Sequence, residues 1–209
     1  MIKRLCDIIF SLVGLIITAP FLLALILAIR LGSQGPAFYR GLRVGKNGKN
    51  FKIFKFRTMV INADKIGGPS TSDDDPRITK VGHFIRKYKL DELAQLMNVL
   101  KGEMSIVGPR PEVPQEVDLY TVEEKRLLEV RPGITDYASI RFHNEGAILK
   151  GAVDPHQAYL KLIRPDKIRL GLEYVKNPTL INYFKIIYLT FRILINSRLA
   201  ACPKSEQTN

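Results

Sequence analysis

The chain has 209 residues, enough for one ordinary domain or a small domain with an anchor; with 46% hydrophobic and 25% charged residues it is neither disordered nor collagen-like. Lys and Arg number 32 against 20 Asp and Glu, and the resulting net charge of +12 favours polyanionic partners such as nucleic acid, anionic lipid or phosphorylated substrates. The two cysteines, Cys6 and Cys202, lie at opposite ends and the histidines His83, His143 and His156 are scattered, which argues against disulfide-rich, zinc and iron–sulfur proteins.

A long apolar run without charge extends from Ile8 to Ile29. As a straight helix it would be about 33 Å long, close to the roughly 30 Å hydrocarbon core of a bilayer. The run is too long for a cleavable signal peptide, and no Ala-x-Ala cleavage site precedes Arg30. We therefore predict that this segment inserts into a membrane.

Pro20 lies near the middle of the run, where it removes one backbone donor and disturbs the preceding turn. Ser11 and Thr18 are able to bond carbonyls that such a break frees. Basic residues flank the run on both sides, with Lys3 before it and Arg30 after it, so the positive-inside rule does not choose an orientation. The residues leave two topologies open: a hairpin that enters and leaves by the cytoplasmic face, and a kinked helix that spans the bilayer.

After the apolar run, a basic, glycine-rich connection contains an Asn47-Gly48 turn signal. The aromatic and basic run FKIFKFRTM (51–59) predicts a short strand. The Gly, Ser and Asp residues of 62–77 predict an exposed loop. Helices are predicted over 78–87 and 91–100, the second from apolar residues at helical spacing.

The proline-rich residues 108–114 predict a stiff turn. Thr121 and Glu124 have the spacing of a capping box, which predicts a helix that Pro132-Gly133 would end. Polar residues near the C-terminus fall on one stripe of an otherwise apolar helix: Asn182, Lys185, Arg192 and Asn196. This pattern favours an amphipathic interfacial helix, and an ordinary core-packed helix is the alternative.

Two adjacent carboxylates, Asp91 and Glu92, open the second predicted helix just after the basic residues of Arg86-Lys-Tyr-Lys. The free amides and the positive dipole end of a helix would favour an anionic Asp and could hold a phosphate. An ionised carboxylate placed there could attack phosphorus and form an acyl phosphate, while its neighbour binds Mg²⁺. The alternative is that both acids only complement the helix dipole.

A second set of candidate functional residues consists of the Lys55-Phe-Arg57 segment and the Pro-Arg110-Pro turn. The planar guanidinium of an arginine fixed by two prolines suits phosphate oxygens. Basic and aromatic residues in alternation could also stack on single-stranded nucleic acid, or form a solvated strand edge. Asp73-x-Asp75 is similar to the metal-binding pair of nucleotide-sugar glycosyltransferases, although simple solvation of these carboxylates is the competing interpretation.

In combination these motifs are more specific than any one alone. The run L-D-E-L-x-Q-L-x-N-V-L-K-G-x-M-S-x-V-G-P-R-P follows the apolar segment and FKIFKFRTM, and precedes RPGIT and YVKNPTLINYFKIIYLT. The chain closely resembles, from about Lys3 to Leu199, the bacterial sugar transferases: monotopic phosphoglycosyl transferases that initiate polysaccharide or glycoprotein glycan assembly.

The resemblance implies an α+β, predominantly helical, monotopic membrane protein with amphipathic interfacial helices. Residues 1–35 would form a re-entrant helix–break–helix with its break at Pro20, which favours the hairpin topology. Residues 36–209 would form a catalytic domain on the cytoplasmic face of the bacterial inner membrane. Membrane lipids are expected partners, nucleic acid is not, and a homodimer is left open.

The resemblance also implies transfer of a phosphosugar from a UDP-sugar to polyprenol (undecaprenyl) phosphate, with release of UMP, an aspartyl phosphosugar intermediate and a Mg²⁺ requirement. Asp91 would be the nucleophile. Glu92 would assist, as a Mg²⁺ ligand or by handling the proton of the acceptor phosphate, and both carboxylates are candidate metal ligands. Four basic residues would hold phosphates: Arg86, Arg110, Lys55 and Arg57.

Two rival functions remain open at this point. The first is a metal-dependent glycosyltransferase that uses Asp73 and Asp75 and releases UDP. The second is a non-catalytic, membrane-tethered basic module, in which Asp91 and Glu92 would have no functional role. The chain also departs from the family after RPGIT, where it reads DYASIRFHNE with His143 near an expected Arg, so the identity of the sugar is left open.

Overall fold

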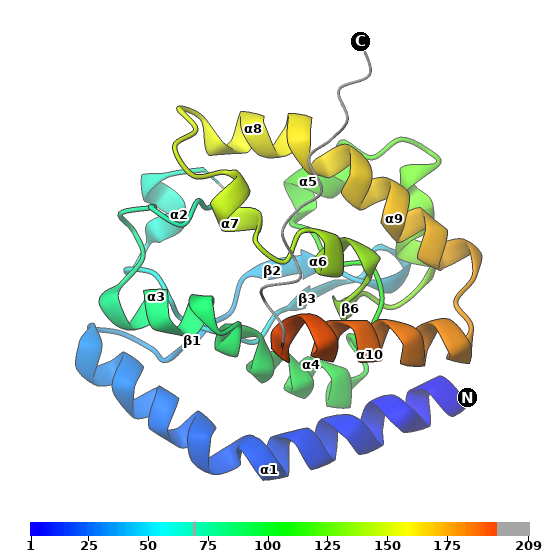
Figure 1. Ribbon diagram of the computed structural model, residues 1–209, viewed down its shortest axis with the longest axis horizontal. Coiled ribbons are helices and arrows are strands. Elements are labelled where there is room, and N and C mark those ends of the chain that lie inside the picture. Colours follow the sequence, from blue (N-terminus) through cyan, green and yellow to red (C-terminus); the bar gives the residue numbers. More distant parts are fainter. Residues whose placement is uncertain (69, 196–209) are drawn as a thin grey trace.

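The computed structural model describes residues 1–68 and 70–195, which form an α+β, predominantly helical fold (Figure 1). The elements of the first half are α1 (Ile2–Gly32), β1 (Phe38–Tyr39), β2 (Leu42–Val44), η1 (Lys46–Gly48), β3 (Asn50–Lys52), β4 (Lys55–Phe56), α2 (Ala63–Ile66), α3 (Lys80–Lys87), η2 (Leu90–Gln95) and α4 (Leu96–Lys101), where η denotes a 3₁₀ helix. Those of the second half are β5 (Ser105–Val107), α5 (Pro114–Asp118), η3 (Glu124–Glu129), β6 (Gly133–Thr135), α6 (Tyr137–Arg141), α7 (Glu145–Ile148), α8 (Pro155–Leu162), α9 (Arg164–Lys176) and α10 (Leu180–Ile195).

The apolar N-terminal run forms one long helix, α1, with Pro20 inside it. Figure 1 shows that α1 is bent, with both of its ends turned toward the rest of the protein, so the predicted break takes the form of a bend within a continuous helix. Thr18 Oγ1 donates to the Gly14 carbonyl at 2.6 Å, a bond of the kind that often bends helices. α1 is long and apolar enough to cross a membrane, and most of its apolar side chains are exposed.

The C-terminal half of α1 packs into the protein core. Leu25 and Ile29 are 5% and 2% exposed and pack with Phe56 and Ile85. Burial of apolar side chains of this size stabilises the contact by about 1.5–3 kcal/mol each. This end of the helix is therefore attached to β4 and α3.

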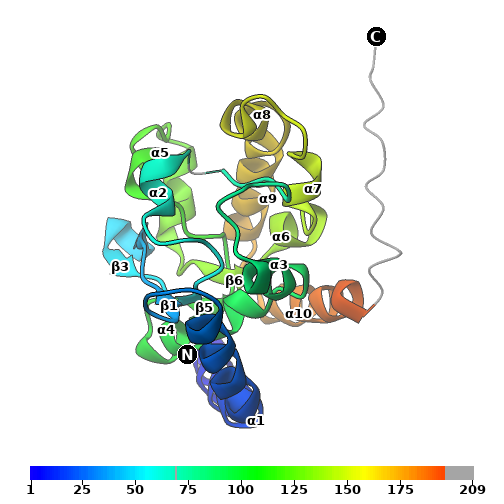
Figure 2. The same ribbon diagram turned by 90° about the vertical axis from the view of Figure 1, so that its left-hand side faces the viewer.

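The N-terminal half of α1 is attached by polar contacts. The buried carboxylate of Asp7 accepts hydrogen bonds from Ser105 Oγ (3.0 Å), the Ile106 amide (2.9 Å) and the Tyr183 hydroxyl (2.9 Å). Arg4 donates to the Leu100 carbonyl at 2.9 Å, near the end of α4. Both ends of α1 are thus fixed to the same domain, at the end of the molecule opposite α8 (Figures 1 and 2).

Three small sheets of two strands each lie in the described part of the chain. β1 pairs antiparallel with β4, and β2 with β3 in a hairpin. The Asn47-Gly48 turn is confirmed, since both residues adopt left-handed φ angles of 57° and 74° between β2 and β3. The single strand predicted over 51–59 is instead divided between β3 and β4, because each segment pairs with a different partner.

β5 and β6 form the only parallel pair in the described ranges, with Ser105 opposite Gly133 and Val107 opposite Thr135. Gly108 and Gly133 lie so close that a Cβ on either would overlap the backbone of the other segment. This close approach requires glycine on both sides. It places the Pro109–Glu112 turn directly after β5, beside β6.

The helix predicted over 78–87 is confirmed as α3, which Thr79 caps through the Gly82 amide at 2.9 Å. The helix predicted over 91–100 begins as the 3₁₀ helix η2 and continues as α4. The capping box is confirmed by reciprocal bonds between Thr121 and Glu124, at 2.8 and 3.2 Å, but the helix it opens is the short 3₁₀ helix η3.

The prediction of an exposed loop over 62–77 is wrong in part. It contains α2, and the side chains of Ser72, Asp75 and Arg77 are buried. Polar residues in such a loop predict solvation, but the ion pair between Asp75 and Arg77 allows both of these charged side chains to be buried.

α10 packs one face into the core, as the core-packed interpretation of this helix expects, and its interfacial placement stays a prediction. Tyr183 and Ile186 are fully buried in the core, whereas apolar side chains such as Phe184 and Tyr188 are exposed. The Phe184 ring meets Phe10 of α1 edge to face, with centroids 6.3 Å apart. Two of the residues discussed from the sequence, Asn196 and Cys202, lie outside the described residues.

Candidate functional site

The turn between α3 and η2 positions the two adjacent carboxylates. Lys89 adopts a left-handed conformation with φ of 55°, which reverses the chain after α3 and begins η2. A non-glycine residue in this region is uncommon and often occurs at functional sites. Asp91 and Glu92 therefore occupy the first turn of η2, where Asp91 is only 3% exposed.

The two carboxylate oxygens of Asp91 differ in their contacts. Lys55 Nζ, projecting from β4, lies 2.8 Å from Asp91 Oδ2. Asp91 Oδ1 is buried and has no hydrogen-bond partner among the residues that the structure describes. A buried carboxylate oxygen without a partner costs free energy, so its retention points to a reacting or ligand-binding group.

Glu92 is tied to Arg110, whose guanidinium forms an ion pair with Glu92 Oε1, and Lys55 Nζ lies 3.9 Å from the same oxygen. Burial alone would raise the pKa of Glu92, but the charges of Arg110 and Lys55 outweigh it and hold that pKa well below its ordinary value. Glu92 is therefore ionised at neutral pH, and it bridges two cations beside Asp91.

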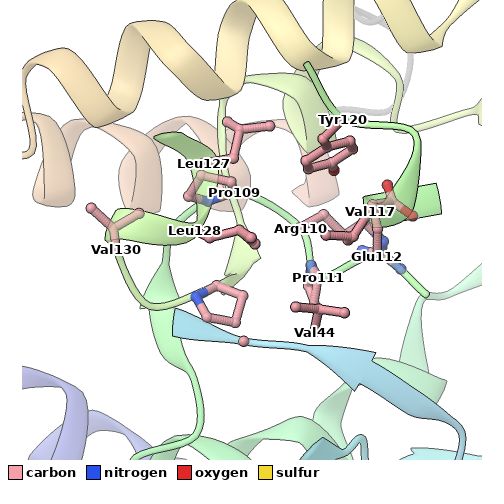
Figure 3. Close-up of a pocket in the computed structure, with 12 residues that line it drawn as sticks. Val44, Pro109, Arg110, Pro111, Glu112, Val117, Tyr120, Leu127, Leu128 and Val130 are labelled. Atoms are coloured by element: carbon pink, nitrogen blue, oxygen red, sulfur yellow. The ribbon is translucent and has the colours of Figure 1, made fainter. Parts of the chain in front are cut away.

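The Pro109–Glu112 turn presents Arg110 to this pair of carboxylates. The Gly133 amide donates to the Pro109 carbonyl and the Val44 amide to the Glu112 carbonyl, each at 2.9 Å. Figure 3 shows the turn beside a small pocket walled by apolar side chains, among them Tyr120 and Leu127. The predicted stiff turn is thus fixed by β2 and β6 on its two sides.

Arg86, near the end of α3, completes the group of cations. Burial lowers the pKa of Arg86, and the charges of Asp91, Asp75 and Asp73 act in the opposite direction. The Arg86 carbonyl accepts from the Lys89 amide, but its guanidinium makes no hydrogen bond or ion pair with any residue in the described ranges. Its guanidinium is free to bind an anion beside Asp91.

The structure does not bring Arg57 into this cluster, although the sequence suggested it as a phosphate ligand. Arg57 is 8% exposed, and its guanidinium donates to the Ser33 carbonyl (2.9 Å), the Ser33 hydroxyl (3.0 Å) and the Gln34 carbonyl. These carbonyls follow the C-terminus of α1, where unpaired acceptors remain. Arg57 therefore holds the C-terminal end of α1, a structural role that the FKFRT motif did not reveal.

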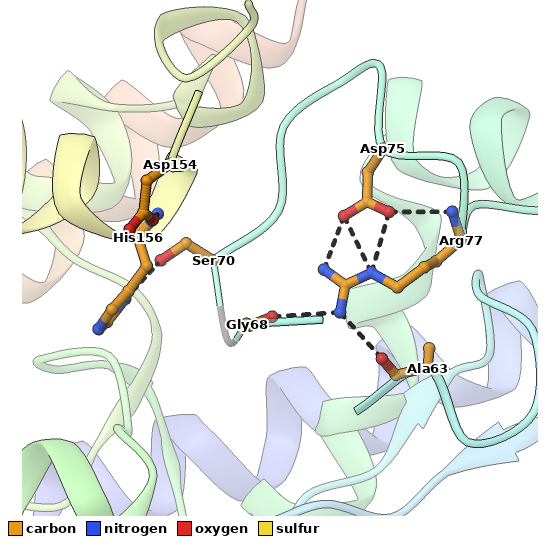
Figure 4. Close-up of polar contacts among 7 residues, drawn as sticks. All are labelled: Ala63, Gly68, Ser70, Asp75, Arg77, Asp154 and His156. Carbon is orange, nitrogen blue, oxygen red and sulfur yellow. Dashed lines mark hydrogen bonds and ion pairs between the residues drawn. The ribbon is translucent and has the colours of Figure 1, made fainter. Parts of the chain in front are cut away.

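In the second acidic motif, Asp73-x-Asp75, the Asp75 carboxylate forms an ion pair with Arg77. Asp75 binds Arg77 through both carboxylate oxygens, at 2.7 to 3.1 Å, and Arg77 also donates to the carbonyls of Ala63 and Gly68 (Figure 4). The hydrogen bond from Arg77 is the main cause of the lowered pKa of Asp75. The Asp73 amide donates to the Gly146 carbonyl at 3.1 Å. Asp75 thus serves to order the loop around Arg77.

Sequence reasoning missed two residues of the site. Lys89 lies near enough to Asp91 and Glu92 for their charges to raise its pKa, against the larger effect of burial. Gln95, one turn after Asp91, is 1% exposed and its side-chain amide nitrogen has no partner within the described part of the chain. The L-D-E-L-x-Q spacing, which places Gln95 four residues after Asp91, is the signal that could have identified it.

The carboxylates fit a Mg²⁺ ion in their donor chemistry. Mg²⁺ is usually held by one or two protein carboxylates together with water and substrate phosphates. Asp91 Oδ1 is unpartnered, and Glu92 uses Oε1 for its contacts with Arg110 and Lys55. One oxygen on each side chain is therefore available to such an ion. No larger cluster of three or more His, Cys, Asp or Glu occurs among the described residues.

Comparison with known proteins places the chain in a family. The model of the bacterial sugar transferase family matches residues 1–197. A Bacillus subtilis protein, named provisionally as an undecaprenyl-phosphate N-acetylgalactosaminyl 1-phosphate transferase, is 51% identical over 113 residues, which cover 54% of this chain and 63% of that protein.

Two larger relatives match nearly the whole chain. The UDP-glucose:undecaprenyl-phosphate glucose-1-phosphate transferase of Escherichia coli is 37% identical over 94% of this chain and 41% of its own length. The UDP-N-acetylgalactosamine-undecaprenyl-phosphate N-acetylgalactosaminephosphotransferase of Aeromonas hydrophila is 36% identical over 93% of this chain and 44% of its own length. This chain therefore spans less than half the length of these two relatives, and it belongs to the bacterial sugar transferase family.

Proposed function

We propose that this protein transfers a sugar 1-phosphate from a UDP-sugar to polyprenol phosphate, such as undecaprenyl phosphate, and releases UMP. The observation that carries the proposal is the buried Asp91 carboxylate, whose Oδ2 lies on Lys55 and whose Oδ1 has no partner in the described part of the chain. The names of the relatives support this reaction class, since they specify UDP-sugars and undecaprenyl phosphate as substrates of those proteins.

The reaction would proceed in two displacements at phosphorus. Asp91 Oδ1 attacks the β-phosphorus of the UDP-sugar, and the bond to the α-phosphate oxygen breaks, which yields UMP and an aspartyl phosphosugar. A phosphate oxygen of polyprenol phosphate then attacks the same phosphorus. The bond to Asp91 breaks, which regenerates the carboxylate and gives polyprenyl diphosphate sugar.

The cations of the site would stabilise charge on the phosphoryl oxygens. The Arg86 side chain has no ion-pair partner within residues 1–68 and 70–195, Arg110 is fixed on a rigid turn, and Lys55 orients the nucleophile through Oδ2. Mg²⁺, when held by the free oxygen of Glu92 together with phosphate oxygens, would neutralise part of the diphosphate charge. Because Arg110 keeps Glu92 ionised with a low pKa, Glu92 suits the orientation of cations better than proton transfer.

We further propose a monotopic, re-entrant placement on the cytoplasmic face of the bacterial inner membrane. Both ends of α1 contact the same domain while the exposed side chains between them are apolar, a placement that suits a helix entering and leaving by one face. Single cysteines at Ile2 and Lys46, in a chain lacking Cys6 and Cys202, should both be protected from impermeant reagent in intact cells. Labelling of position 2 from outside would contradict the hairpin.

Nucleotide release tests the reaction. Full-length protein in nanodiscs is incubated with Mg²⁺ and either UDP-glucose or UDP-N-acetylgalactosamine, the donors named for the relatives, plus other UDP-sugars in turn. UMP and UDP are assayed separately, with and without undecaprenyl phosphate. Sustained UMP formation that depends on the lipid is expected. UDP formation would contradict the proposal and favour glycosyl transfer by another site.

A further inference from the structure

A second carboxylate lies on the turn that carries Arg110. Glu112 follows Arg110 by two residues, and Glu112 Oε1 lies 2.7 Å from Lys167 Nζ on α9. The Tyr159 hydroxyl of α8 accepts from Lys167 at 3.1 Å and donates to Glu112 at 3.4 Å. The two charged side chains are only 20% and 15% exposed, so water screens their charges weakly. These contacts link the turn that carries Arg110 to the α8–α9 unit.

Arg110 is thus flanked by two acids, Glu92 and Glu112. Burial alone would raise the pKa of Glu112, but the charge and hydrogen bond of Lys167 outweigh it, and the charge of Arg110 acts in the same direction. The Arg110 guanidinium itself contacts Glu92, and the other acids whose charges raise its pKa are Glu145 and Asp91. Lys167, and not Arg110, forms the ion pair with Glu112.

We infer that Lys167 is a positioning residue: it neutralises Glu112 and thereby reserves Arg110 for Glu92 and for the diphosphate of the donor. The inference rests on the proposed function, in which Arg110 binds phosphate. Without Lys167, the ionised Glu112 would be left buried and unpaired, and Arg110 is a cation near enough to replace it. Rotation of Arg110 toward Glu112 would release Glu92 and remove a phosphate ligand from the site.

Other charged groups near the pair are less able to replace Lys167. The titratable neighbours of the pair are Arg110, Arg43, Tyr159, Tyr120 and Glu145. Arg43 donates to the Leu42 carbonyl, and the two tyrosines have raised pKa values because of burial and the charge of Glu112. Arg110 is therefore the cation of the turn itself that could replace Lys167 as the partner of Glu112.

Charge removal at Lys167 tests the inference in full-length protein held in nanodiscs. Lys167→Met keeps the length of the side chain but removes its charge, and the KM for the UDP-sugar is expected to rise by about tenfold, with the KM for polyprenol phosphate unchanged. Glu112→Gln/Lys167→Met removes both charges and should return the donor KM to near the wild-type value. Lys167→Arg keeps the charge and should also preserve it.

A matched control lies on the same helix. Arg164 of α9 pairs with Glu124 at 3.0 Å, with side chains 20% and 15% exposed, so Arg164→Met breaks an ion pair of similar burial that does not touch the Arg110 turn. This variant should lose thermal stability with an unchanged donor KM. The inference is overturned if Lys167→Met leaves the donor KM unchanged, or if the double variant stays as defective as the single one.

If Lys167→Met does not fold, the Glu112→Gln/Lys167→Met variant tests the inference. This variant lacks the unpaired charge of Glu112, so it should fold and have a normal KM for the donor. A folded double variant with a raised donor KM overturns the inference. Wild-type protein that forms no UMP contradicts the proposed function instead. Failure of the positioning role and failure of the reaction are thus separated.

Discussion

Asp75 and Asp91 are both buried and both paired with a cation, yet they differ in what remains of each carboxylate. Arg77 binds both oxygens of Asp75, whereas Lys55 binds only Oδ2 of Asp91, and Oδ1 has no partner among the residues described. A bidentate guanidinium satisfies a carboxylate completely, and an ammonium at a single oxygen does not. Burial and charge are therefore alike in the two acids, and the number of satisfied oxygens is what separates the acid that we propose to react from the acid that orders a loop.

The largest effect is expected from Asp91→Asn. This change keeps the size of the side chain but replaces the carboxylate by an uncharged, weakly nucleophilic amide, so lipid-dependent UMP formation should fall by at least about 10⁴-fold. Nucleotide release measured per folded molecule is the assay. A variant that keeps even a tenth of the wild-type rate would remove Asp91 from the role of nucleophile.

Asp75→Ala should have the converse outcome. It leaves the Arg77 guanidinium buried without its partner, and breaking a buried ion pair costs about 3 kcal/mol or more of stability. The melting temperature should fall by several degrees, while UMP remains the product at a measurable rate. Unchanged stability with complete loss of turnover would mean that Asp75 takes part in the chemistry, and the contrast with Asp91 would be lost.

A smaller effect concerns pH. The pKa of Asp75 in the folded protein lies below its ordinary value of 3.8, chiefly because of the hydrogen bond from Arg77. The pair therefore stabilises the fold above pH 3.8, and that stabilisation is lost as the pH falls through the folded pKa. The difference in melting temperature between wild type and Asp75→Ala should narrow on acidification from pH 5 toward pH 3. A difference that widens would contradict the assigned pairing.

The sequence predicted the surroundings of Asp91 better than those of Asp75. Asp91, Glu92, Lys55 and Arg110 come from three separate motifs, and the structure brings all four together. These motifs are local and carry charge of opposite sign, so their attraction could be foreseen. The pairing of Asp75 with Arg77 was missed, because charged residues in a glycine-rich loop have the composition of a solvated surface.

Long-range partners explain the other differences. Arg57 was expected at phosphate, but it binds the carbonyls after α1, a contact between segments that no local pattern encodes. Lys167 and Glu112 likewise lie in distant elements, and only the packing of α9 against the turn region reveals their ion pair. The 3₁₀ geometry of η2 depends on the left-handed turn at Lys89, a residue type that gives no signal for that conformation.

Trapping the covalent intermediate tests the central claim most directly. Full-length protein in nanodiscs, given Mg²⁺ and a UDP-sugar labelled on the β-phosphate, is quenched without polyprenol phosphate and its peptides are mapped. The account predicts one equivalent of label on the peptide that contains Asp91, a matching burst of UMP, release of the label on addition of the lipid, and no label in Asp91→Asn. Lipid-dependent UMP formation without any labelled protein, or label on a different residue, would contradict it.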